Sequence, residues 1–172
     1  MTTPGASKTP MFAAVAGGAA LALAGAFFLG QVSARRPKAM TFSGIELPRL
    51  DRSATTDLGS CPGAKCLTVY VAPWCGYCRR ATPLLKEAKA ALAAQGISTR
   101  IVIGMDQLAA VEEYAREFGA DALIDVDSKV KVPGGVPHFF MSDAGGTILK
   151  NQAGAPPTLG EAVRWALSAA ER

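Results

Sequence analysis

Residues 67–80 read LTVYVAPWCGYCRR and decide how the chain folds. The run from Leu67 to Ala72 is mostly β-branched, aromatic or apolar, which is typical of a buried strand. From Cys75 to Gln95 apolar side chains recur at helical spacing, and a glycine follows as a stop signal. The stretch therefore predicts a strand that leads directly into a helix, with Cys75 and Cys78 at the junction.

The rest of the chain alternates strands with helices and ends in a hairpin and a last helix. We expect strands over residues 97–104, 137–142 and 147–152, and helices over residues 105–118 and 158–170. This order predicts an α/β fold with a mixed central sheet flanked by helices, in one domain over residues 58–172. A chain of 172 residues has room for such a domain and a further segment.

The further segment is a predicted transmembrane helix near the N-terminus. Residues 11–32 carry no charge, and about 20 apolar residues match the thickness of a bilayer. Residues 1–10 are expected to be disordered, and residues 33–57 to form a linker with a short strand near 40–47. A cleaved signal peptide is the alternative, because Val32-Ser33-Ala34 resembles a cleavage site. The apolar run exceeds a usual signal-peptide core, which favours an uncleaved anchor.

The positive charge of the chain is concentrated around this segment. Four of the 18 basic residues and none of the 14 acidic ones lie in the first 38 positions, so the net charge of +4 belongs to them. Such charges favour anionic lipid headgroups and give no reason to expect a nucleic-acid partner. Taken alone, Arg35, Arg36 and Lys38 would place the C-terminal domain in the cytoplasm.

Cys75 and Cys78 have the spacing of a redox pair. A Cys-X-X-Cys at a helix N-terminus has a depressed thiol pKa, because unsatisfied N–H groups and the helix dipole favour the thiolate. We expect Cys75 to attack a substrate disulfide and Cys78, one turn later on the same helix face, to resolve the mixed disulfide. The sequence therefore predicts a catalytic site formed by these two residues.

These motifs resemble the thioredoxin superfamily. The Trp-Cys-Gly-Tyr-Cys run after an apolar strand, Pro83 inside the following helix, and Gly135-Val136-Pro137 before a strand are similar to that family's motifs. The resemblance implies a thioredoxin-like fold, a cis bond before Pro137, and exchange with protein thiols or disulfides of the reductase or isomerase type, without a cofactor or metal. It places Val136 and Pro137 opposite the cysteine pair, where they would contact substrate. Trp74 and Tyr77 are predicted to dock substrate, with simple packing against the loop as the alternative, and Gly76 between the cysteines is a further predicted substrate-binding residue.

One position departs from the family. The strand of thioredoxin proper holds a buried acid where this chain has Val69, so proton transfer to and from Cys78 lacks its familiar partner. A single membrane helix before a thioredoxin-like domain is similar to anchored bacterial proteins that reduce or shuffle disulfides outside the cytoplasm. The resemblance thus implies a single-pass protein of the inner membrane. Its catalytic domain would face the periplasm, with a membrane-embedded or soluble redox partner.

A second cysteine pair, Cys61 and Cys66, stands just before the first strand with a Pro-Gly turn between its members. A structural disulfide is the preferred interpretation, and it presupposes an oxidising compartment, which outweighs the flanking charges in predicting orientation. A second exchange pair that passes electrons to Cys75 is the alternative.

Three further interpretations stay open at this point. All four cysteines together could bind zinc, although two of them at a strand-to-helix junction favour redox chemistry over a metal. The rival from another class is a non-catalytic module that holds a partner or metal, with structural cysteines. His138 is the only histidine and follows Pro137, so tuning of the thiolate is a second hypothesis beside an ordinary strand residue.

Overall fold

The computed structural model describes residues 39–168. Several predictions fall outside these residues: the disordered N-terminus, the transmembrane helix over residues 11–32, the first part of the linker and the last two residues of the final helix. Between residues 39 and 168, none of the helices has both the length and the apolar character needed to span a bilayer.

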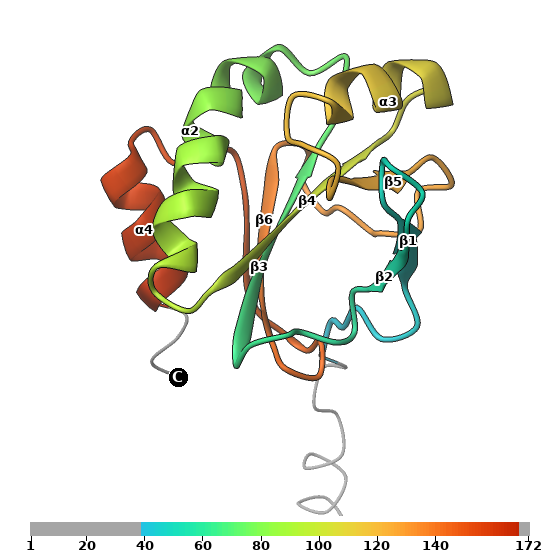
Figure 1. The fold of residues 1–172 in the computed structure, drawn as a ribbon. Coiled ribbons are helices and arrows are strands. Elements are labelled where there is room, and N and C mark those ends of the chain that lie inside the picture. The colour runs from blue at the N-terminus through green and yellow to red at the C-terminus, as the bar shows by residue number, and fades with distance from the viewer. Residues whose placement is uncertain (1–38, 169–172) are drawn as a thin grey trace, which may run out of the picture. The chain divides into compact units, whose positions relative to one another are not determined.

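A five-stranded mixed sheet forms the centre of the domain, with the strand order β5-β4-β3-β6-β7 (Figure 1). Strand β3 is central and pairs in parallel with β4 and antiparallel with β6. The predicted α/β class with a mixed sheet is therefore confirmed. The bounds are β3 Lys65–Val71, β4 Ser98–Gly104, β5 Leu123–Asp125, β6 His138–Asp143 and β7 Ile148–Ala153.

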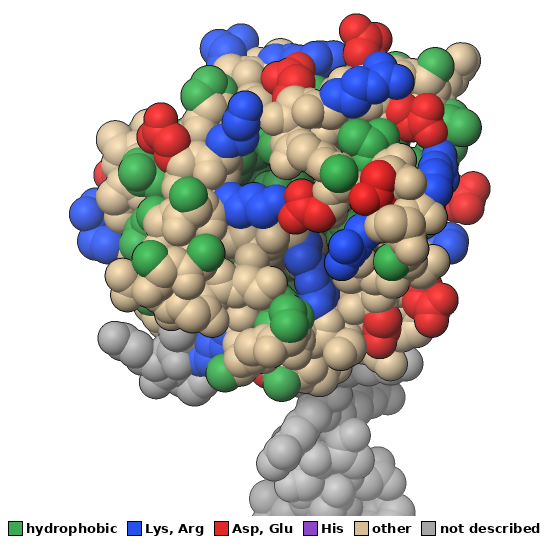
Figure 2. Space-filling model, viewed as in Figure 1, with side chains coloured by type: hydrophobic (Ala, Val, Ile, Leu, Met, Phe, Trp, Pro, Cys, Tyr) green, Lys and Arg blue, Asp and Glu red, His purple; other side chains and the backbone are tan. Residues whose placement is uncertain are grey.

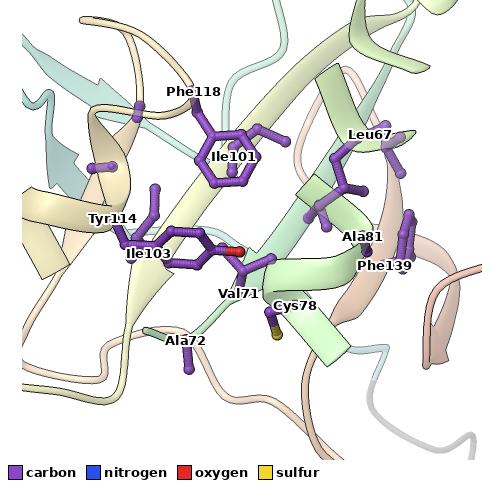
Figure 3. Packing of buried hydrophobic residues seen from close by; sticks show 14 of the residues in the cluster. Leu67, Val71, Ala72, Cys78, Ala81, Ile101, Ile103, Tyr114, Phe118 and Phe139 are labelled. Carbon is purple, nitrogen blue, oxygen red and sulfur yellow. The ribbon is translucent and has the colours of Figure 1, made fainter. Parts of the chain in front are cut away.

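Three helices pack against one face of this sheet: α2 Gly76–Ala93, α3 Leu108–Ala115 and α4 Leu159–Ser168. Strand residues alternate between the two faces, so Leu67, Val69 and Val71 of β3 point toward the helices. They meet buried side chains of α2, α3 and α4 in one hydrophobic cluster, which also contains Cys75 and Cys78. Figure 3 shows part of this cluster, including Cys78. Both cysteines thus belong to the main core.

The opposite face of the sheet is covered by the segment that precedes β3. Phe42, Leu47 and Leu58 are buried there against Tyr70 and Phe140, and the rings of Phe42 and Phe140 meet edge to face with centroids 5.3 Å apart. This second cluster gives the sheet a core on both sides, which explains why β3 reads as a nearly continuous apolar run.

This covering segment corrects the predicted domain boundary. Residues 33–57 were expected to be a linker, but Glu46–Pro48 forms β1 and Thr55–Asp57 forms β2, which pair with each other antiparallel. Isolated bridges join Thr41 to Thr147 and Arg49 to Leu123. The folded domain therefore starts well before residue 58, because its second face needs these residues as a cover.

The predicted elements from residue 65 onward match the structure closely, apart from one omission. Strand β5 comprises three residues, and neither its length nor its pattern distinguishes it from a loop in the sequence. It extends the sheet beside β4, with Ile103 opposite Ile124.

Candidate functional site

Cys75 lies where strand β3 passes into helix α2, as the sequence predicted. It occupies the position that caps the helix, with an extended backbone, and its Sγ accepts a hydrogen bond from the backbone N–H of Cys78 at 3.2 Å. Its own N–H donates to the carbonyl of Ala72 at 3.1 Å. The first turn of α2 contains no acidic residue, so the helix dipole acts on Cys75 without compensation.

The two sulfurs differ in accessibility. Cys75 is 5% exposed and Cys78 is fully buried, which gives Cys75 the outer position that an attacking thiol needs. Burial, followed by the hydrogen bond with Cys75, raises the pKa of Cys78 to about 12. Cys78 is therefore a protonated thiol at neutral pH, held directly behind Cys75.

The loop before β6 faces the cysteine pair. The Val136–Pro137 peptide bond is cis, which agrees with the resemblance, and the carbonyl of Val136 accepts a hydrogen bond from the Cys75 thiol at 3.4 Å. Gly134 and Gly135 precede it with φ values of 81° and 104°, in the left-handed region that favours glycine. The sequence PGGVP thus brings a backbone carbonyl to the sulfur of Cys75.

Two aromatic side chains flank Cys75 at the surface. Trp74 is 63% exposed and Tyr77 is 73% exposed, although the indole N–H of Trp74 donates to the carbonyl of Met105 at 2.8 Å. Trp74 is therefore oriented by the β4–α3 loop with its ring open to solvent. Their substrate-binding role, like that of Gly76, Val136 and Pro137, remains a prediction.

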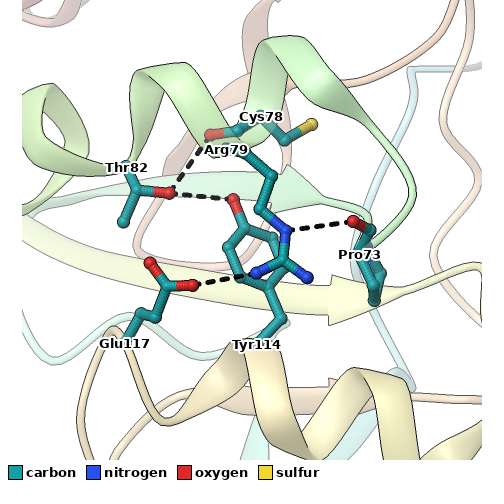
Figure 4. A network of polar contacts seen from close by, with 6 residues as sticks. All are labelled: Pro73, Cys78, Arg79, Thr82, Tyr114 and Glu117. Carbon is teal, nitrogen blue, oxygen red and sulfur yellow. Dashed lines mark hydrogen bonds and ion pairs between the residues drawn. The ribbon is translucent and has the colours of Figure 1, made fainter.

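A network of polar contacts that the sequence did not indicate lies directly behind Cys78 (Figure 4). The Thr82 hydroxyl donates to the carbonyl of Cys78 at 3.2 Å and lies 3.0 Å from the hydroxyl of Tyr114. Because Thr82 has a single proton and uses it on the carbonyl, Tyr114 is the donor in the second bond. Within residues 39–168, Tyr114 is the member of the hydrophobic cluster around both cysteines that carries a hydroxyl group.

The Arg79 side chain contacts both this network and the loop before Cys75. Its Nε donates to the carbonyl of Pro73 at 3.1 Å, and its Nη1 pairs with Glu117 at 2.9 Å. Its guanidinium also lies over the ring of Tyr114, 4.1 Å from the centroid. Burial, the largest of several influences, raises the pKa of Tyr114 to about 12, so the phenol keeps its proton at neutral pH. The only sequence signal for the network was the helical spacing that put Tyr114 in the core.

Among residues 39–168, no buried carboxylate lies beside Cys78 in the way that the buried acid of thioredoxin proper would. Val69 is buried in the hydrophobic cluster around the cysteines. The buried carboxylate of Asp125 accepts from Tyr70 Oη at 3.1 Å and from the backbone N–H groups of Lys129 and Val130 at 2.8 and 3.1 Å. It lies on the opposite face of the sheet, so the departure predicted at Val69 holds in the structure.

The His138 side chain also lies on the face of the sheet opposite the helices. Its ring nitrogens lie 3.2 Å from the carbonyl of Gly135 and 3.1 Å from Oδ1 of Asn151, and its ring lies beside that of Phe140. These contacts connect the loop that contains the cis bond to β7. The hypothesis that His138 tunes the thiolate by contact receives no support from them.

Cys61 and Cys66 form a disulfide, as preferred from the sequence. Cys66 is the second residue of β3, whereas Cys75 follows the far end of the strand. The five residue steps from Cys66 to Val71 span about 16 Å. Direct exchange between the two pairs and a zinc site of four cysteines are therefore excluded by geometry. No group of three or more metal-binding side chains occurs within residues 39–168.

The disulfide loop is fixed by contacts of its own. The N–H of Cys61 donates to the carbonyl of Ala144 at 3.1 Å. The buried guanidinium of Arg100 donates to the carbonyls of Leu58 and Ser60, just before the loop. The disulfide therefore closes a segment that is already anchored to β4 and to the β6–β7 turn.

Comparison with known proteins identifies the fold. The chain matches no family model and no curated protein. Three of the solved structures similar to it illustrate the match. The MTB dsbF protein, solved in mixed oxidised and reduced forms, has a TM-score of 0.60 and 18% identity over 77% of this chain and 99% of its own.

The other two come from a mycobacterium and a streptococcus. A secreted Mycobacterium tuberculosis disulfide oxidoreductase homologous to E. coli DsbE has a TM-score of 0.54 and 19% identity, over 74% of this chain and 96% of its own. The exposed lipoprotein thioredoxin Etrx1 of Streptococcus pneumoniae has a TM-score of 0.59 and 19% identity, over 72% of this chain and 98% of its own. At these identities the likeness shows the fold alone, which is thioredoxin-like.

Proposed function

We propose that this chain is a thiol–disulfide oxidoreductase of the reductase or isomerase type, which acts on protein thiols or disulfides through Cys75 and Cys78. The observation that supports this most strongly is the position of Cys75 Sγ, 3.2 Å from the N–H of Cys78 and 3.4 Å from the carbonyl of Val136. A thiol at a helix N-terminus, with a buried partner thiol one turn behind it, is equipped for disulfide exchange. The solved structures that share the fold are described as disulfide oxidoreductases or thioredoxins, which favours the same class.

The reaction proceeds in two displacements. The thiolate of Cys75 attacks one sulfur of a substrate disulfide, so a Cys75–substrate disulfide forms, the substrate disulfide breaks, and one substrate thiolate leaves and takes up a proton. Cys78 then loses its proton and attacks Cys75, which forms the Cys75–Cys78 disulfide and releases the second substrate thiol. Two electrons and two protons pass from the protein dithiol to the substrate.

The chain's own residues determine the order of these displacements. The hydrogen bond from the N–H of Cys78 and the start of α2 stabilise negative charge on Cys75. Because its raised pKa keeps Cys78 protonated, Cys78 does not compete for the first attack. Val136 presents its backbone to a substrate segment beside Cys75, and Trp74 and Tyr77 offer exposed apolar surface on either side.

Insulin reduction by the full-length chain, purified in mild detergent and supplied with dithiothreitol, tests this proposal. Activity should be lost in Cys75→Ser, while Cys78→Ser should accumulate a mixed disulfide with substrate. The Cys61→Ser/Cys66→Ser double variant is the matched control, because it removes two sulfurs at the other end of β3 and should stay active. Inactivity of the wild-type chain, or full activity of Cys75→Ser, would contradict the proposal. Stoichiometric zinc or copper in protein purified without oxidant would instead favour a non-catalytic binding module.

The reductase or isomerase type is tested by the reduction potential of the Cys75–Cys78 couple. Thioredoxin lies at about −270 mV, protein disulfide isomerase at about −180 mV and the oxidant DsbA at about −120 mV. We expect a value in the lower part of this range. A potential near that of DsbA would contradict the reductase and isomerase types.

We further propose that residues 11–32 anchor the chain in the inner membrane and that the domain faces the periplasm, where a membrane-embedded or soluble partner restores its redox state. The uncharged apolar run supports the anchor. A Cys61–Cys66 disulfide favours an oxidising compartment. A reporter enzyme that is active only outside the cytoplasm, fused after Arg172, should be active, and its silence would reverse the orientation.

A further inference from the structure

Two consecutive arginines after Cys78 have different surroundings. Arg79 is bound on several sides: it donates to the carbonyl of Pro73, pairs with Glu117 at 2.9 Å and covers the ring of Tyr114. Its charge is therefore balanced by a carboxylate, and its guanidinium is occupied by contacts within the protein.

Arg80 is exposed and lies on the side of α2 that carries the redox motif. Its Cζ is 4.3 Å from the centroid of the Tyr77 ring. A Cβ added to Gly76 would lie 3.5 Å from Nη1 of Arg80, so the guanidinium covers the glycine that follows Cys75. The ion pairs found within residues 39–168 join other side chains, and none includes Arg80.

The uncompensated charge of Arg80 is a local feature of the cysteine site. Over the face seen in Figure 2, basic and acidic side chains are interspersed, which limits any long-range field. At the start of α2, however, no acidic residue occurs in the first turn, and the helix dipole has the same sign as the guanidinium. A cation–π contact with the exposed ring of Tyr77 holds the guanidinium of Arg80 near Gly76, the residue that follows Cys75.

We propose that Arg80 is a specificity-determining residue that favours protein substrates with an acidic side chain next to the reactive cysteine. This rests on the proposed function, because a substrate cysteine must reach Cys75 for its neighbours to reach Arg80. In an extended substrate that lies along Val136, the side chains on either side of the reactive cysteine would come close to Gly76 and Tyr77. A carboxylate there meets a guanidinium whose planar N–H groups suit bidentate binding, whereas a lysine meets a like charge.

The expected effect follows from the exposure of the site. Exposed ion pairs are weak and screened by salt, so one favourable contact should raise the second-order rate constant about two- to fivefold over a neutral substrate. A lysine in the substrate should lower it by a similar factor. The ratio between acidic and basic substrates should therefore be about fourfold or more at low salt and approach one at high salt.

The test uses the prereduced full-length chain in single-turnover reactions with three disulfide-linked peptides. The peptides are identical except that aspartate, serine or lysine flanks the cysteine on both sides. Rate constants are measured at about 20 mM and about 500 mM NaCl. Arg80→Gln should remove most of the preference, and Arg80→Glu should reverse it.

Lys86→Gln is the matched control, because it removes the same charge from an exposed position on the same helix. Six residues of helix place it about 9 Å farther along the axis than Arg80, too far for direct contact with the same carboxylate, so Lys86→Gln should change the preference much less than Arg80→Gln. Equal rates for all three peptides in the wild-type chain, or a preference that persists in Arg80→Glu, would overturn the inference. Inactivity toward every peptide would overturn the proposed function as well, whereas activity without preference overturns the role of Arg80 alone.

Discussion

Removal of the Tyr114 hydroxyl should cost stability although it leaves almost no cavity. Tyr114 is fully buried, and its O–H donates to Thr82 Oγ1 at 3.0 Å, behind Cys78. Tyr114→Phe keeps the ring against Arg79 and Phe118 and deletes one buried hydrogen bond. A bond of this kind contributes about 0.5–1.5 kcal/mol net, and the Thr82 oxygen left without its donor adds to the loss. We expect a loss of about 1–2 kcal/mol in the free energy of unfolding.

Thr82→Val should cost more, because it deletes two hydrogen bonds with little change of shape. Thr82 loses its bond to the carbonyl of Cys78, and the Tyr114 hydroxyl is left buried without an acceptor. An unsatisfied buried hydroxyl costs about 1–3 kcal/mol. In the double variant both hydroxyls are absent, so the total should fall short of the sum of the single variants by about 1 kcal/mol.

Urea denaturation of the reduced chain at neutral pH measures these free energies, with a common slope for all variants. Tyr77→Phe is the control, because its hydroxyl belongs to a side chain that is 73% exposed, and it should change stability by less than about 0.5 kcal/mol. If Tyr114→Phe matched the wild type, or if the two single losses simply added, the hydroxyl chain behind Cys78 would have no energetic role.

Three further outcomes follow from the described contacts. Because burial raises the pKa of Cys78 to about 12, the unfolded chain loses this proton at lower pH than the folded chain. The stability of the reduced protein should therefore fall between about pH 9 and pH 12, as measured by thermal unfolding. Cys78→Ala should remove part of that fall. Reduction or replacement of the Cys61–Cys66 disulfide, which closes six residues, should lower the free energy of unfolding by about 2 kcal/mol, and an unchanged urea midpoint would contradict this. Gly104→Ala should destabilise the fold by about 1–3 kcal/mol or more or prevent expression, because the added Cβ would collide with the Tyr70 hydroxyl and a carbonyl of β5. Soluble protein with the wild-type melting temperature would contradict this, because the sheet would then have shifted to accommodate the Cβ.

Most of the fold from β3 onward could be predicted because its signals are local. The apolar run that ends at Ala72, the helical spacing after Cys75 and the turn residues before β6 each determine one element without reference to the others. The short strands were different. Thr55–Asp57 and Leu123–Asp125 have no periodicity of their own and form strands because a neighbouring segment pairs with them.

The candidate site likewise has features that local sequence predicts and features that depend on how distant segments pack. The cysteine spacing and Pro137 are sequence motifs, and the disulfide between Cys61 and Cys66 follows from their proximity in the chain. The bond from Tyr114 to Thr82 joins residues 32 positions apart, so it depends on how α3 is placed against α2. The difference between Arg79 and Arg80 likewise depends on Glu117 and Tyr77, which the sequence does not assign to either arginine.

The separation of the two cysteine pairs along β3 has a consequence for the disulfide exchange that we propose. The chain carries, between Cys61 and Cys66, a bond of the type that its proposed substrates contain. Because the length of a strand separates Cys75 from the Cys61–Cys66 bond, and Cys66 is fully buried, a molecule cannot consume its own crosslink during turnover. The strand therefore keeps the Cys61–Cys66 disulfide out of reach of Cys75 in the same molecule.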